Sequence, residues 1–158
     1  GELNYLLQAG LVFGKVPYPL LSHFAGNQTY VFDIHRFSLM NNYQYAADKY
    51  ISLQAHWNGK GVLFNLIPGV RYARLRELLE LKVAYGGLRK DHQEVLPFPT
   101  TKSGYNTLAA LRIPYVEVGV GIGNILRIGE VYGVFRLTQA TNQITPLYAI
   151  RFRLYLGM

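Results

Sequence analysis

The sequence predicts an all-β protein: an antiparallel transmembrane β-barrel to which this chain contributes about seven C-terminal strands. Apolar and polar residues alternate repeatedly along the chain, as strands with two different faces require. Tyrosine and glycine are abundant, with 13 and 16 copies in 158 residues. No apolar run approaches the roughly 18 residues of a membrane-spanning helix, so only strands could cross a bilayer. We treat residues 1–158 as one domain, the C-terminal part of the barrel.

The last third of the chain contains the clearest expected strands, which are 114–122, 130–138 and 148–156. In each of them one face carries valine, isoleucine, leucine or phenylalanine, and the other carries charged residues, tyrosine or glycine. Earlier strands are expected at 4–13, 50–57 and 79–86, with a poorer one at 30–37. Leu75, Leu78 and Leu79 also fit a helical stripe, so a helix is the alternative just before residue 79.

Glycine and proline mark the connections between these strands. If the final strand ends at the periplasmic rim, the long polar connection 87–112 lies outside and the short Gly123-Asn124 turn lies inside, as is usual for such barrels. The connection 58–72 then lies on the periplasmic side and is longer than usual.

A soluble β-sandwich is the alternative fold, because its strands alternate in the same way. The polar positions favour the barrel, since they mix isolated charges of both signs with glycine and tyrosine instead of the water-facing Lys, Glu, Thr and Ser of a sandwich. We expect these charges to line the lumen as a ladder across the strands, where they either pair and fill the barrel or line a solute path or hold a plug. They are Glu80, Lys82, Glu117, Glu130, Arg136, Arg151 and Arg153.

Aromatic residues near the expected strand ends predict membrane interfaces, where tyrosine and tryptophan anchor at headgroup level; ordinary edge packing is the alternative. They are Trp57, Tyr85, Tyr115 and Tyr148. Arg89, Lys90 and Lys102 in the long connection could meet phosphates of a surface glycolipid, or they are simply solvated.

Other chemistry is disfavoured. The net charge of +7 is spread singly and forms no basic stripe, so we expect no nucleic-acid partner. The glycines at 119, 121 and 123 alternate within a strand instead of opening a helix, which argues against phosphate binding. Ser52 and His56 share a face but lie about 13 Å apart along a strand, too far for a nucleophile and base. The chain has no cysteine, and the spacing of its histidines indicates no metal site, so we expect no cofactor and no catalytic residues.

Several short stretches follow one another nearly end to end along the chain. They include GKVPYPL at 14–20, GNQTY at 26–30, FSLMNNY at 37–43, HWNG at 56–59, FNLIP at 64–68, YGGL at 85–88, PYVE at 114–117 and GNIL at 123–126. In order and spacing they resemble a family of large Bacteroidetes outer-membrane proteins of unknown function with a carboxypeptidase-regulatory-like domain ahead of a C-terminal barrel. The resemblance implies that the remaining strands and a periplasmic domain lie upstream.

The expected function is that of a non-catalytic bacterial outer-membrane barrel acting in transport, export or assembly of envelope components. The alternatives are a plugged scaffolding subunit of a larger outer-membrane complex and a barrel-embedded lipid-modifying enzyme. The expected partners are outer-membrane lipid and glycolipid, barrel strands from upstream sequence or another chain, and other envelope proteins.

Overall fold

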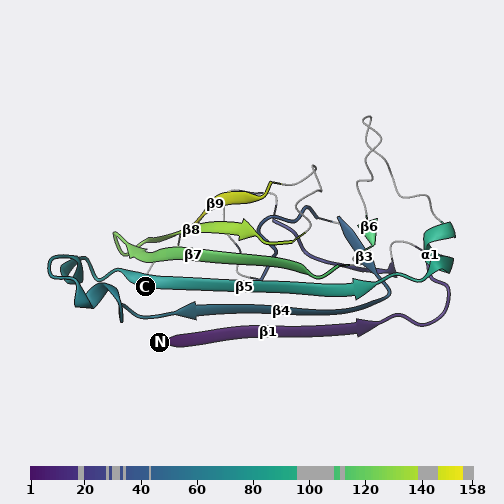
Figure 1. The fold of residues 1–158 in the computed structure, drawn as a ribbon, viewed down its shortest axis with the longest axis horizontal. Helices are drawn as coiled ribbons and strands as arrows, with labels where there is room; N and C mark the ends of the chain where they lie inside the picture. The colour runs from purple at the N-terminus through teal and green to yellow at the C-terminus, as the bar shows by residue number, and fades with distance from the viewer. Residues whose placement is uncertain are drawn as a thin grey trace.

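The computed structural model describes residues 1–17, 20–27, 29, 33, 35–42, 44–95, 109–110, 113–138 and 146–154, with the backbone alone at 93–95 and 109–110. The main element is one six-stranded sheet in the order β1-β4-β5-β7-β8-β9. Its strands are β1 (Glu2–Leu11), β4 (Lys49–Asn58), β5 (Arg76–Gly87), β7 (Tyr115–Ile125), β8 (Gly129–Arg136) and β9 (Tyr148–Leu154). All neighbours in it are antiparallel (Figure 1).

The predicted all-β, mostly antiparallel fold is confirmed, while the predicted strand count is corrected in one place. β1 pairs directly with β4, so no strand from 30–37 stands between them. Of that stretch, 30–32 and 34 lie outside the described residues, and Phe37 forms an isolated parallel bridge with Gly26. The ambiguous segment before residue 79 is strand, because β5 begins at Arg76.

Smaller elements lie at the two ends of this sheet. β2 (Ser22–His23), β3 (Tyr45–Ala47) and β6 (Ala109–Ala110) form a second sheet in which β3 is central. It lies toward the same end as α1 (Lys90–Val95), as Figure 1 shows. At the opposite end, the connection between β4 and β5 contains the 3-10 helices η2 (Phe64–Leu66) and η3 (Val70–Ala73). None of the helices in the described ranges is long and apolar enough to cross a membrane.

The strand register places the apolar residues of neighbouring strands side by side on one face of the sheet and the polar residues on the other. Leu81 pairs with Ala55 on β4 and Val118 on β7, and Val118 pairs with Phe135 on β8. Because side chains alternate along a strand, every such row faces one side. The apolar rows are largely exposed, with Val120 at 54% and Ile150 at 59% of full exposure, whereas Lys82 and Glu117 in the polar rows are at 1%. We call the side with the exposed apolar rows the outer face and the side with the buried polar rows the inner face.

The described residues between 20 and 48 (20–27, 29, 33, 35–42 and 44–48), which we call the inner segment, pack against the inner face. Phe24, Phe37, Met40 and Tyr45 of this segment form a core with Ala84 and Tyr115 of the sheet. The Phe37 and Tyr115 rings meet edge to face, with centroids 5.7 Å apart, a favourable aromatic geometry. A second cluster joins Leu39 to Leu78, Tyr132 and Val134. The inner face thus carries both the packed core and the buried charges.

The two edges of the sheet remain open in the described part of the chain, where β1 and β9 each pair on one side only and the sheet does not close on itself. The connections alternate between its ends. Those after β1 and β5 lie at the end of Leu11, Lys49 and Gly87, and the turn between β7 and β8 lies at the other end. That turn falls slightly later than predicted, because β7 continues past Gly123 to Ile125 with a register shift after Ile122.

Candidate functional site: the charged inner face

The inner face carries a row of charges that runs across neighbouring strands. Gln54 on β4 pairs in register with Lys82 on β5, Lys82 with Glu117 on β7, and Glu117 with Arg136 on β8. Directly opposed residues of an antiparallel pair place their Cβ atoms about 4.5–5.5 Å apart. The charges therefore alternate in sign across three strands, and all three side chains are buried.

Lys82 joins this row to the inner segment. Its ammonium forms an ion pair with Glu80, two residues away on the same face of β5. It also donates a hydrogen bond to the backbone carbonyl of Arg36 and another to Ser38 Oγ at 3.3 Å. A buried ammonium is costly unless it is paired, so these contacts account for its stable burial.

Glu117 contacts the same stretch of the inner segment, around Ser38, as a hydrogen-bond acceptor. Its carboxylate accepts hydrogen bonds from the backbone N–H of Ser38 at 2.8 Å and of Leu39 at 2.7 Å. The Tyr115 hydroxyl donates a third, at 2.6 Å. An irregular segment has no ladder to satisfy its backbone groups, so a carboxylate that accepts two N–H groups fixes its path.

Arg151 on β9 supplies the third contact with this segment. Its guanidinium donates to the backbone carbonyls of Thr29, Asn27 and Ser38. Charged side chains from β5, β7 and β9 therefore converge on the backbone around Ser38. The sequence predicted these three residues on one face but not their common target.

A separate polar cluster joins β4, β8 and β9. Tyr132 donates to Glu130 Oε2 at 3.0 Å, and Arg153 lies 3.5 Å from the same carboxylate. His56 Nε2 lies 2.7 Å from the Tyr132 hydroxyl. Because that hydroxyl donates to Glu130, His56 Nε2 carries the proton and donates to it. The hydrogen bond of His56 thus goes to Tyr132, not to Ser52, which is buried at 3% exposure.

The predicted charge residues share the inner face, and all but Arg153, whose side chain is 34% exposed, are buried. The predicted interface aromatics divide. Tyr85 and Tyr148 lie exposed near the strand ends on the outer face, and the half-buried Trp57 lies near the end of β4. Tyr115 differs from the other three, because its side chain is fully buried on the inner face. Because side chains alternate along a strand and Val116 belongs to the apolar face, the position of Tyr115 directly before it already predicted the inner face.

A further cluster, which sequence reasoning missed, ties three connections together at the end of the sheet where Leu11, Lys49 and Gly87 lie; we call this the long-connection end. Asp48 Oδ2 accepts from the Arg89 backbone N–H and Nε, both at 2.9 Å, and lies 3.2 Å from His92 Nδ1. His92 Nε2 accepts from the Val16 N–H at 3.2 Å, so Nδ1 carries the proton and donates to Asp48. Arg89 also donates to the carbonyls of Val12 and Gly14.

Asp48 is the centre of this cluster. Burial alone raises the pKa of Asp48, but the hydrogen bonds from Arg89 and His92 and the charge of Arg89 outweigh it. The pKa of Asp48 is therefore held below its ordinary value, and the carboxylate stays ionised. As for metals, the described residues contain no group of three or more His, Cys, Asp or Glu side chains that could hold an ion.

The fold and the site define an all-β protein in which one sheet face uses buried charges to hold a segment of its own chain. The chain belongs to the family described as "Family of unknown function (DUF5686)", whose C-terminal domain model matches residues 1–96. The match includes β1, β4, β5 and the whole inner segment. Of the predicted resemblance, membership of a family of unknown function is thus confirmed. Comparisons with curated proteins and with solved structures gave no match.

Proposed function

We propose that the chain forms part of the wall of a transmembrane antiparallel β-barrel in a bacterial outer membrane. We further propose that it is non-catalytic and acts in transport, export or assembly of envelope components. The observation that carries the proposal is the inverted polarity of the sheet: its outer face is apolar and exposed, and its inner face is charged and buried.

The exposed apolar residues of the outer face form a continuous patch and are not scattered singly. Each of the six strands contributes to it, through Leu3, Leu7, Ile51, Leu79, Leu81, Val120, Ile122, Phe135, Ile150 and Phe152 among others. Contiguous apolar patches of this kind mark contact with a partner or a membrane. In a β-sandwich the apolar face would be the covered one. Here the covering layer packs on the face that carries the buried charges together with a small core, while the apolar outer face stays exposed, which favours acyl chains as its surroundings.

The open edges agree with this proposal. In a bilayer every backbone donor and acceptor must be bonded within the sheet, so the free sides of β1 and β9 require further strands. We propose that these come from upstream sequence or from another chain. A Bacteroidetes origin and an N-terminal carboxypeptidase-regulatory-like domain belong to the same proposal, through the sequence resemblance. Other envelope proteins are proposed partners.

The inner segment narrows the lumen in this proposal. The second candidate function, a plugged scaffolding subunit, is favoured by one observation: Lys82, Glu117 and Arg151 are all engaged in holding that segment. Conductance of the full-length protein in planar bilayers separates the two. A conducting protein supports transport, and a silent one supports scaffolding.

A matched pair on β1 tests the membrane proposal. Leu3 and Leu7 are both 60% exposed on the outer face, but Leu3 lies near the strand end and Leu7 in the middle. If the outer face is in water, Leu→Arg should lower the free energy of unfolding only slightly, and by the same amount at both positions. In a bilayer, Leu7→Arg should cost about 2–4 kcal/mol, and Leu3→Arg about 0–1 kcal/mol, because the penalty grows with depth.

The measurement is urea unfolding of the full-length protein in lipid vesicles, with the folded fraction read from gel migration before and after boiling. Equal, small losses at Leu3 and Leu7 would contradict the membrane proposal. So would a wild-type protein whose migration does not change on boiling.

A further inference from the structure

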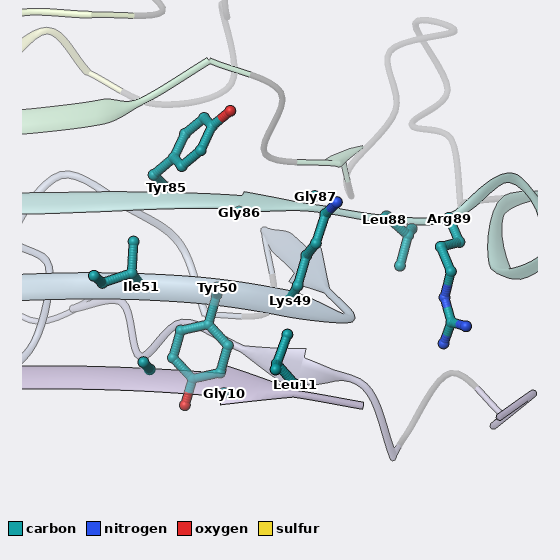
Figure 2. Close-up of a pocket in the computed structure, with 11 residues that line it drawn as sticks. Gly10, Leu11, Lys49, Tyr50, Ile51, Tyr85, Gly86, Gly87, Leu88 and Arg89 are labelled. Carbon is teal, nitrogen blue, oxygen red and sulfur yellow. The ribbon is translucent and has the colours of Figure 1, made fainter. Parts of the chain in front are cut away.

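The outer face has a hollow at the long-connection end of β1, β4 and β5. Its volume is about 880 Å³, within the range of ligand pockets, and it includes Leu11, Ile51, Tyr85, Gly87, Lys49 and Arg89 (Figure 2). The hollow lies beside the Asp48 cluster, where the strands meet their connections.

The register explains why the hollow exists. Ala9, Ile51 and Tyr85 form one outer-face row, and Leu11, Lys49 and Gly87 form the next. Ala9 and Gly87 are small, so space remains between the larger side chains of each row. A Cβ atom at Gly87 would lie 2.9 Å from Lys49 Cε, so the stem of Lys49 lies across the glycine. The floor of the hollow is therefore apolar.

The charge at this end of the hollow is positive. Lys49 is exposed, and no acidic side chain in the described ranges forms an ion pair with it. The neighbouring Arg89 is held by Asp48 and by the carbonyls of Val12 and Gly14, so its charge is fixed in place but partly compensated. Figure 2 shows the Lys49 side chain reaching from β4 toward Gly87 on β5.

From this arrangement we propose that the hollow binds one lipid with an anionic phosphate headgroup. The acyl chain lies along Ile51, Leu11 and Tyr85, and the phosphate meets the Lys49 ammonium. The apolar floor selects for a chain, and the lysine at its end selects for the negative charge. This inference rests on the proposed function, because only a sheet embedded in a bilayer presents its outer face to lipid.

The test is native mass spectrometry of the full-length protein in detergent, titrated with phosphatidylglycerol. Diacylglycerol provides the arm without phosphate, and glycerol 3-phosphate the arm without acyl chains. The wild type should retain phosphatidylglycerol above diacylglycerol, and glycerol 3-phosphate should not compete. Lys49→Gln should weaken retention of phosphatidylglycerol about fivefold, the factor that corresponds to about 1 kcal/mol per lysine at an anionic membrane surface.

Lys15→Gln is the matched control, because Lys15 is an exposed lysine at the same end but outside the hollow. It should retain the lipid as the wild type does. Unchanged retention in Lys49→Gln, an equal loss in Lys15→Gln, or competition by glycerol 3-phosphate would each overturn the lipid site. If the boiled and unboiled wild type migrate alike, the proposed function itself fails and the lipid site with it. If migration shifts normally while Lys49→Gln has no effect, only the lipid site fails.

Discussion

Removing the buried ammonium of Lys82 should destabilise the protein strongly. The Lys82 and Glu80 side chains are 1% and 2% exposed, so Lys82→Met leaves the Glu80 carboxylate buried without its partner. Breaking a buried pair in this way costs about 3–5 kcal/mol. Methionine has a similar length, so a packing loss contributes little to the effect.

An exposed lysine, Lys60, provides the control for the loss of stability in Lys82→Met. Lys60 pairs with Glu2 at 3.1 Å, and both side chains are 54% exposed. Lys60→Met should therefore cost less than about 1 kcal/mol, the usual value of a surface pair. The free energy of unfolding is measured in urea for the full-length protein, with the folded fraction read from heat-modifiable gel migration.

A double-mutant cycle then separates the ion pair from the other contacts of Lys82. Glu80→Gln removes the stranded charge, so the double variant should be more stable than the sum of the two single losses predicts. The remaining loss reports the bonds to Arg36 O and Ser38 Oγ, and limited proteolysis should then cleave near Ser38 more readily. The reasoning is refuted if Lys82→Met costs no more than Lys60→Met, or if the two single losses simply add.

Two further predictions concern the other polar clusters. Tyr132→Phe removes the hydroxyl that joins His56 to Glu130 and should cost about 1–3 kcal/mol in the same unfolding assay, because it leaves buried polar groups unsatisfied. Tyr5→Phe, at a 73% exposed tyrosine, is its control and should cost almost nothing. Acidification should remove the contribution of Asp48: its folded pKa is below its ordinary value, so that contribution is complete above about pH 4 and disappears as the pH falls through the folded pKa. Asp48→Asn should flatten the dependence of the unfolding free energy on pH below pH 4, whereas Asp33→Asn, at an exposed carboxylate, should not.

These two predictions have clear contradicting results. A Tyr132→Phe loss equal to that of Tyr5→Phe would mean that the hydroxyl is not buried in a hydrogen-bond network. An Asp48→Asn variant with the same acid profile as the wild type would mean that the Arg89 and His92 contacts do not stabilise the ionised carboxylate.

Much of the sheet was predictable from the sequence because a strand has a period of two residues. That period assigns Val118 and Val120 to one face and Glu117 to the other without knowledge of any partner strand. The same rule placed Lys82 and Arg151 on the charged face, where the structure has them. It also disagreed with the interface position given to Tyr115, which local context near a strand end had suggested.

The sequence by itself determined the strands, their two faces and the residue types on each. Only the tertiary structure decided which face is covered, and by what. Ser38 meets Glu117 across 79 residues of sequence, and Asp48 meets Arg89 across 41. No local periodicity carries such contacts, because they depend on where an irregular segment folds back and satisfies its backbone groups. The buried charges could be read from alternation, but their role in holding the inner segment required the folded chain.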